Sequence, residues 1–216
     1  MRTLRFFTIL SLIAIMVIPA TASAKGLSGE KYGFALLGAR DYDAYNDPSV
    51  SIKLGVNLPV DHTLDITPFF IYETVDADTS IIGINQQEFD SYTLGARGDY
   101  FITEKGSMKI YAGGGLGYVR TETTACVTVP IIGTQCTDGS DSDLYFQAHG
   151  GMDMDMGEKI GLRPECAYTR IGNKDDVNCG ALFNLKLGES FNLLAEARFF
   201  MDNRELFYSI GGGMKF

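Results

Sequence analysis

The sequence predicts an all-β protein that folds as an up-and-down antiparallel β-barrel. Three observations predict it: apolar and polar residues alternate in ten segments, the connections between them alternate between long and short, and no segment has a convincing helical stripe. Ten is the favoured strand count, and eight is the alternative. The expected strands are 31–40, 49–58, 62–74, 87–102, 107–121, 142–156, 159–171, 177–188, 191–201 and 205–216.

The first 24 residues have the three parts of a secretory signal peptide. Arg2 and Arg5 give a positive start, residues 6–18 are apolar, and Ala22-Ser23-Ala24 is a cleavage site for signal peptidase. The apolar run is too short to span a membrane comfortably as a helix. We therefore expect a cleaved signal at 1–24 and one barrel domain at 25–216. No later segment is apolar for long enough to be a membrane helix.

Composition excludes several functions. The chain has 18 basic and 27 acidic residues, a net charge of −9, which argues against nucleic-acid binding. It has only two histidines, which leave little material for a histidine metal site or a catalytic triad. We expect no cofactor.

The strands have one apolar and one polar face. In 49–58, for example, Val50, Ile52 and Leu54 alternate with Ser51 and Lys53. A soluble barrel turns its apolar face inward, whereas a membrane barrel turns it outward. The polar faces carry many charges of both signs that a closed lumen could pair, and this favours a transmembrane barrel. Glycines in the run 113–117 and at 211–213 would make room for long basic side chains. The expected lumen network contains Lys53, Asp65, Glu73, Arg97, Asp99, Lys109, His149, Asp153, Asp155, Arg163, Glu165, Lys186, Glu196 and Arg198, with Lys215 on the same kind of face.

The connections fall into two classes, and each class predicts one side of the membrane. The longer ones are acidic: 41–48, 75–86, 122–141 and 172–176, with a short fifth at 202–204. The others are tight turns, at 59–61, 103–106, 157–158 and 189–190. Outer-membrane barrels have short periplasmic turns and longer extracellular loops. Both termini then lie on the periplasmic side.

The C-terminal tail resembles a known signal. In YSIGGGMKF, apolar residues alternate up to a terminal phenylalanine, and this resembles the C-terminal insertion signal of outer-membrane barrels. With the signal peptide and the alternating strands, residues 25–216 resemble small outer-membrane β-barrels of the OmpA, OmpX and opacity-protein kind. Most of those have eight strands, and this chain has no tryptophan, so an interfacial girdle would consist of tyrosine and phenylalanine. The insertion-signal residues are Tyr208, Ile210, Met214 and Phe216.

This resemblance implies a location and a set of partners. We expect a monomer in the outer membrane of a Gram-negative bacterium, in contact with outer-membrane lipid and lipopolysaccharide and inserted by the barrel-assembly machinery. An extracellular ligand or a host surface is a further expected partner.

Four cysteines, an even number, fit an oxidising compartment. Of the three possible pairings, we favour Cys126–Cys136 together with Cys166–Cys179. The first would stiffen the longest external loop. The second would join adjacent strands across a hairpin centred between Gly172 and Asn173.

Two residue groups invite a chemical interpretation. His149 shares a polar face with Asp153 and Asp155, as a general base could, but its mid-strand position places it deep in the lumen, where an internally bonded histidine is the better interpretation. There is no His-x-Ser pair, and we expect no enzyme. The carboxylates of Asp138, Asp141 and Asp143 have chemistry that suits Ca²⁺. Their spacing does not match an EF-hand loop, and a hydrated acidic rim is favoured.

The leading functional prediction is a surface protein with a plugged polar lumen. Its role would be structural or adhesive and would be carried by the loops 41–48, 75–86 and 122–141, because loops on a rigid scaffold carry binding. The alternative is a narrow porin-like channel for small, cationic solutes. A less favoured alternative is an outer-membrane enzyme that hydrolyses lipid or peptide.

Overall fold

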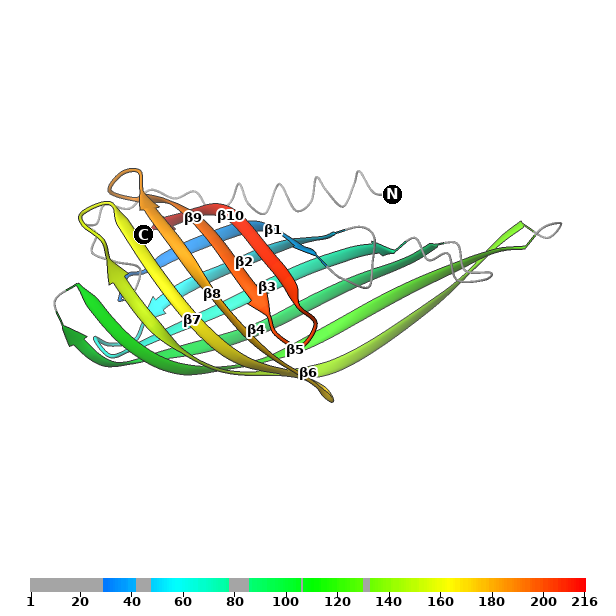
Figure 1. Ribbon diagram of the computed structural model, residues 1–216, viewed down its shortest axis with the longest axis horizontal. Helices are drawn as coiled ribbons and strands as arrows, with labels where there is room; N and C mark the ends of the chain where they lie inside the picture. The colour runs from blue at the N-terminus through cyan, green and yellow to red at the C-terminus, as the bar shows by residue number, and fades with distance from the viewer. Residues whose placement is uncertain (1–28, 42–47, 78–85, 106, 130–132) are drawn as a thin grey trace.

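Ten antiparallel strands close into a barrel in the computed structural model of the chain (Figure 1). The structure describes residues 29–41, 48–77, 86–105, 107–129 and 133–216, so the predicted signal peptide lies outside the described residues. Each strand pairs with its neighbours in sequence, and β1 pairs with β10 from Tyr32↔Lys215 to Asp41↔Leu206. The predicted topology and the count of ten are confirmed. The strands are β1 (Tyr32–Asp41), β2 (Ser49–Pro59), β3 (Leu64–Ala77), β4 (Gln86–Lys105), β5 (Met108–Val129), β6 (Gly133–Asp155), β7 (Ile160–Ile171), β8 (Lys174–Lys186), β9 (Phe191–Phe200) and β10 (Glu205–Lys215).

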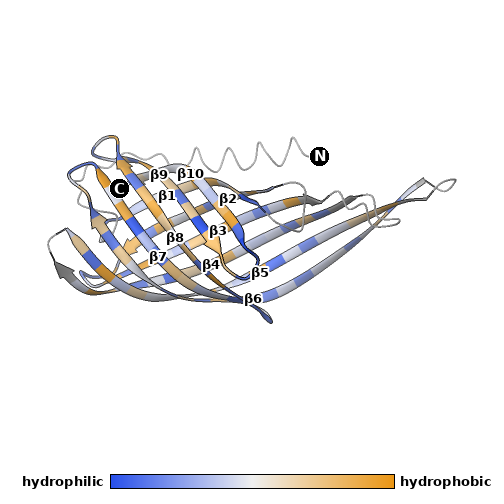
Figure 2. Ribbon diagram, viewed as in Figure 1, coloured by the Kyte–Doolittle hydropathy of each residue, from blue (hydrophilic) through white to orange (hydrophobic). Residues whose placement is uncertain are grey.

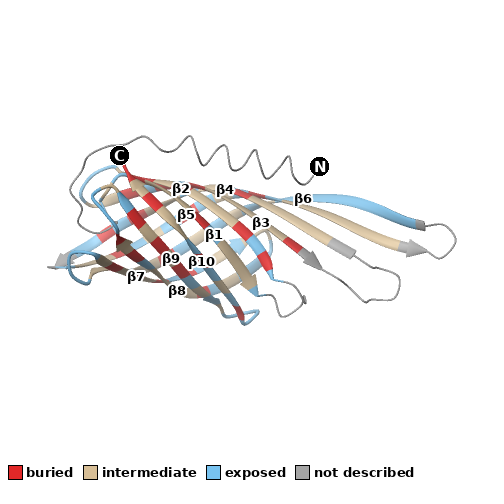
Figure 3. Ribbon diagram, turned by 90° about the horizontal axis from the view of Figure 1, so that it is seen from above, coloured by how far each residue is buried: buried red, intermediate tan, exposed pale blue. Residues whose placement is uncertain are grey.

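The barrel turns its apolar side chains outward. Leu94, Leu116 and Leu144 are 65%, 63% and 60% exposed, whereas Asp99 and Lys215 are each 1% exposed. Apolar and polar residues alternate along the strands, and buried residues form bands around the barrel (Figures 2 and 3). A soluble barrel would have the opposite pattern, because water favours apolar side chains in the interior. The orientation predicted from the charged faces is the one observed.

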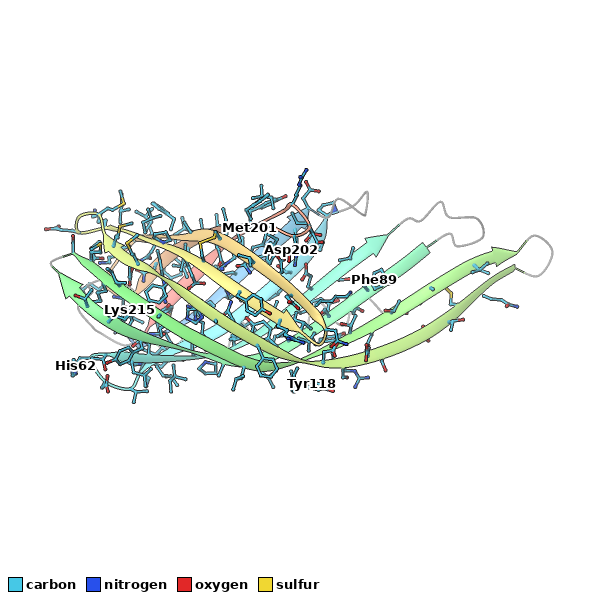
Figure 4. The ribbon with its side chains drawn as sticks, turned by 60° about the horizontal axis from the view of Figure 1, so that its bottom comes forward. His62, Phe89, Tyr118, Met201, Asp202 and Lys215 are labelled. Atoms are coloured by element: carbon cyan, nitrogen blue, oxygen red, sulfur yellow. A yellow bond between two sulfur atoms is a disulfide. The ribbon has the colours of Figure 1, made fainter. Side chains whose placement is uncertain are left out.

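The two ends of the barrel differ in their connections. His62 and Lys215 lie toward the end with the tight turns, and Phe89 and Asp202 lie toward the other end (Figure 4). In the β2–β3 turn, Asp61 accepts hydrogen bonds from the hydroxyl of Thr63 at 2.7 Å and from the backbone N–H groups of Thr63 and Leu64. The hydroxyl hydrogen bond is the largest cause that lowers the pKa of Asp61. An ionised Asp61 therefore holds this turn closed.

The β7–β8 turn is shorter than the sequence predicted. It consists of Gly172 and Asn173, because β8 already begins at Lys174. Gly172 has φ of 58°, a conformation that glycine adopts without steric cost. The predicted centre of the hairpin is confirmed by the register, which places Cys166 opposite Cys179.

β4, β5 and β6 are much longer than the other strands. They have 20, 22 and 23 residues, and the rest have 10 to 14. Their outer parts project beyond the barrel as a blade, which we define as residues 86–91, 119–129 and 133–143 (Figure 1). The predicted loop 122–141 is therefore wrong for most of its length, because β5 and β6 pair as far as Val129↔Gly133. The β6 arm of this hairpin is exposed from 134 to 142 and polar on both faces, so it lacks the apolar alternation by which the barrel strands were predicted.

No helix in the described ranges is long and apolar enough to cross a membrane.

Candidate functional site

The centre of the lumen is built around Glu165, an inward residue of β7. Its carboxylate accepts hydrogen bonds from Arg97 of β4 and Arg198 of β9, both at 2.6 Å, and from the hydroxyl of Tyr111 of β5 at 2.9 Å. Glu165 is only 5% exposed. Three strands that do not pair with β7, namely β4, β5 and β9, are thereby tied to it through one carboxylate.

Asp99 is a second buried anion, and it shares Arg97 with Glu165. Its carboxylate accepts hydrogen bonds from Arg163 at 2.6 Å and from Arg97 at 2.8 Å. His149 Nε2 lies 2.6 Å from Asp99 Oδ1, and the side chain of His149 is fully buried. The histidine is thus bonded inside the barrel, away from external substrates.

Glu196 extends the chain of ion pairs to β2. It accepts a hydrogen bond from Arg198 Nε at 2.6 Å and lies 3.5 Å from the ammonium of Lys53. Since β2 and β9 are separated by β10 and β1, the contact spans the interior. We call the connected residues the lumen ion-pair network: Lys53, Arg97, Asp99, His149, Arg163, Glu165, Glu196 and Arg198.

The other predicted lumen residues also lie on inner-face positions, and two of them, Asp65 and Glu73, have hydrogen-bond partners outside the network. Asp65 accepts hydrogen bonds from Asn57 at 3.0 Å and from the backbone N–H of Gly29 at 2.9 Å. Glu73 accepts one from Ser49 at 2.7 Å. The sequence assigned these side chains to a face but did not show which of them meet. The remaining members are Lys109, Asp153, Asp155 and Lys186.

Two inward glycines make room for the network. A Cβ atom on Gly113 would collide with the imidazole of His149, and one on Gly180 would collide with the side chain of Arg198. Interiors are close-packed, so a collision of this kind forces a shift of the neighbouring groups. The predicted role of inward glycine is therefore supported at Gly113, and Gly180, which lies outside the predicted runs, has the same role.

An apolar layer fills the lumen next to the network, and sequence analysis missed it. Its buried members are Tyr32, Leu36 and Leu194, with Phe34 and Leu182 packed against them. The sequence does indicate this layer: apolar residues occupy consecutive positions in 34–37 and 193–195, so both faces of the strands are apolar there. A cavity of about 70 Å³ is lined by both the apolar layer and the network.

A second interior ion pair was also missed, near the extracellular end. Arg40 of β1 donates a hydrogen bond through Nε to Glu205 of β10 at 2.7 Å, and its guanidinium lies 3.8 Å from the centre of the Phe200 ring. Asp176 lies at 4.0 Å from the same guanidinium. The pair fixes the seam at which the first and last strands close the barrel.

Both favoured disulfides are present, on different parts of the molecule. Cys126–Cys136 joins β5 to β6 within the blade. Cys166–Cys179 joins β7 to β8 on the outer face of the barrel, where Cys166 is exposed. The described residues contain no free cysteine.

The predicted acidic residues of the blade are not brought together. Asp138 lies on one face of β6 and Asp141 and Asp143 lie on the other, because side chains alternate along a strand. Asp138 accepts a hydrogen bond from Thr124 at 3.0 Å, and Asp141 accepts one from the backbone N–H of Ser142 at 2.8 Å. Among the residues that the structure describes, no three His, Cys, Asp or Glu side chains are grouped to hold a metal ion.

The predicted external loops are only partly described. Residues 42–47, 78–85 and 130–132 lie outside the described ranges. The residues of the predicted insertion signal alternate on the outer face of β10 and at the C-terminus: Tyr208, Ile210, Met214 and Phe216.

A closed antiparallel barrel with an apolar exterior and ion pairs inside defines an integral membrane barrel. The chain belongs to the family of outer membrane protein beta-barrel domains, whose model matches residues 7–191. This family is located in the outer membrane of Gram-negative bacteria.

Several solved structures are similar to this chain at low sequence identity. The translocator domain of the autotransporter NalP from Neisseria meningitidis is 12% identical with a TM-score of 0.58, over 100% of this chain and 96% of that one. The beta domain of the Bordetella autotransporter BrkA is 12% identical with a TM-score of 0.57, over 87% and 99%. Neisserial surface protein A is 15% identical with a TM-score of 0.44, over 86% and 96%. A search of curated protein sequences gives no significant relative.

Proposed function

We propose that this protein is an outer-membrane surface protein that binds extracellular partners through its blade and does not conduct solutes through its lumen. The observation that carries the proposal is the projection of β6 beyond the barrel. β6 begins at Gly133, but its pairing with β7 begins only at Tyr145. A rigid scaffold that holds polar strands in water is a common basis for binding.

Interior packing supports the proposal of a closed lumen. The network joins β2, β4, β7 and β9 across the interior, and the apolar layer of Tyr32, Leu36 and Leu194 lies beside it. A solute would have to separate ion pairs and also displace buried apolar side chains. Small barrels are generally filled by side chains in this way.

The binding role can be tested with cells that display the protein. We expect cells with the native protein to adhere to immobilised extracellular-matrix proteins or to host cells. A variant whose blade is shortened by joining β5 to β6 at the barrel rim should lose that adhesion. Heat-modifiable migration on gels would show that the shortened protein still forms its barrel. Equal adhesion by native and shortened proteins would contradict the proposed role.

A narrow channel is the second candidate function. One observation favours it: Asn184 and Asn192 are buried on the inner face, and their amide groups have no hydrogen-bond partner among the described residues. Such groups are stabilised by water, so a hydrated lumen would suit them. Purified protein in a planar lipid bilayer distinguishes the candidates. A closed lumen predicts a silent membrane, and steady single-channel currents would favour the channel.

A further inference from the structure

The outer part of β6 is a sheet edge. β5 pairs with β6 along the whole blade, but β7 pairs with β6 only from Tyr145↔Ile171 inward, and the backbone N–H of Gly172 reaches the carbonyl of Leu144 at 3.1 Å. Residues 133–143 therefore have a strand partner on one side only within the described chain. These 11 residues form an edge about 35 Å long at the usual rise of a strand.

Strand geometry shows which backbone groups point away from β5. The backbone carbonyl of Leu144 points toward β7. The direction of the backbone N–H and C=O groups alternates with each residue, so those of Cys136, Asp138, Ser140 and Ser142 point to the same side as those of Leu144. The disulfide supports this assignment. The Cα atoms of Cys126 and Cys136 are 4.1 Å apart, a separation typical of antiparallel pairs that exchange no hydrogen bonds.

Among the residues that the structure describes, one of these backbone donors is capped by a neighbouring side chain. The N–H of Ser142 donates to the Asp141 carboxylate at 2.8 Å. The backbones of Cys136, Asp138 and Ser140 form an open edge, and the side chains from 134 to 142 are all exposed (Figure 3). Proteins usually protect such edges with proline, lysine or a covering segment. Residues 133–143 contain neither proline nor lysine.

The charge of the blade limits what can pair with this edge. It carries six acidic residues and one basic residue, Arg120, whose guanidinium is paired with Glu122 at 2.9 Å. A second copy that paired edge to edge would bring Asp138 and Asp141 beside equivalent carboxylates, and like charges on adjacent strands repel. A strand with lysine or arginine side chains would be attracted instead.

We propose that the β6 edge at 136–140 binds an extended, cationic segment of another protein, which adds to the blade as an additional antiparallel or parallel strand. Main-chain hydrogen bonds would hold the segment, and the carboxylates of Asp138 and Asp141 would select its charge. The Cys126–Cys136 disulfide fixes the edge before binding, which lowers the entropic cost of association. This inference rests on the proposed surface-binding function and assigns it a mode and a class of partner.

The first experiment measures binding of a fluorescent peptide of alternating lysine and threonine to the full-length protein in lipid nanodiscs. Ser140→Pro removes the outward N–H and leaves the β5 side of the ladder intact. Ser140→Ala is the matched control, because it removes the side-chain hydroxyl group and keeps the backbone N–H. We expect Ser140→Pro to weaken binding by at least about tenfold and Ser140→Ala to bind like the native protein.

Two altered peptides separate strand pairing from simple charge attraction. A copy that is N-methylated at every residue keeps its charge but has no N–H group with which to form the ladder, and a copy with glutamate in place of lysine keeps the backbone. We expect neither to bind. Equal binding of the N-methylated peptide, or equal affinities of Ser140→Pro and Ser140→Ala, would overturn the inference.

The cell-adhesion assay separates failure of this inference from failure of the proposed function. Loss of adhesion in both Ser140→Pro and the shortened blade would support strand addition. If Ser140→Pro cells adhere normally and shortened-blade cells do not, the blade binds in another way and strand addition is wrong. If cells with the native protein do not adhere at all, the proposed function is wrong and this inference is overturned with it.

Discussion

Glu165 and Arg198 connect β7 to β9 through the inside of the barrel: Arg198 Nη2 lies 2.6 Å from Glu165 Oε1. The same carboxylate is bound by Arg97 from β4, so one anion is shared by two guanidinium groups. All three side chains are largely removed from water, with side-chain exposures of 3%, 15% and 16%. Buried charges depend on such pairing, because each would be costly alone.

Glu165→Gln should therefore destabilise the folded barrel. The substitution keeps the shape of the side chain but removes the shared anion, so Arg97 keeps its pair with Asp99 and Arg198 its pair with Glu196. We expect a loss of about 1–3 kcal/mol in the free energy of unfolding, measured by urea titration in lipid vesicles. Glu158→Gln, at an exposed site in the β6–β7 turn, is the control. Equal stability of the two variants would show that the network does not hold the barrel together.

Gly113→Ala should also destabilise the barrel, for a steric reason. The added methyl group would collide with His149 and with the carbonyl of Gly98, and overpacking of this kind costs about 1–3 kcal/mol. Gly139→Ala in the blade is the matched control, since nothing lies within 4 Å of the added carbon. The same urea titration measures both. A native-like Gly113→Ala would mean that the lumen has more space at this position than the structure shows.

Removal of the blade disulfide should loosen the blade and leave the barrel intact. Cys126→Ser combined with Cys136→Ser opens a loop closed over a separation of 10 residues, which the chain-entropy model values at about 2–3 kcal/mol. We expect faster hydrogen exchange at 121–129 and unchanged urea unfolding of the barrel. The comparison variant combines Cys166→Ser with Cys179→Ser. This variant should lower the free energy of unfolding of the barrel instead. The prediction fails if the first pair of substitutions changes barrel unfolding as much as the second.

The sequence predicted the barrel well because a membrane barrel imposes a simple rule. Every spanning strand has one face toward lipid and one toward the lumen, so alternation reveals both the strand and the orientation. The inward positions of Lys53, Arg97 and Glu165 followed from this rule, and so did the register that opposes Cys166 and Cys179.

The specific contacts could not be predicted in the same way. Glu165 is 68 residues from Arg97 and 33 from Arg198, and they meet only because the sheet closes on itself. The part of the blade at 122–141 was missed for a different reason. Its β6 arm is exposed from 134 to 142 and polar on both faces, so that arm shows no apolar alternation, and the β5 arm is indicated by β-branched residues such as Thr121, Thr123 and Val127.

The apolar layer provides the sharpest test of a closed lumen. Tyr32→Ala, Leu36→Ala and Leu194→Ala together would remove the buried side chains that pack beside the network, and water and small ions could then reach it. We expect this triple variant to give steady currents in a planar bilayer where the native protein gives none. The control replaces lipid-facing neighbours, Leu37→Ala with Leu193→Ala, which alters as many strands but leaves the interior filled. A triple variant that conducts no current but retains its heat-modifiable fold would show that the ion-pair network alone closes the lumen. Currents from the lipid-facing control would show that leakage arises from general loosening of the barrel.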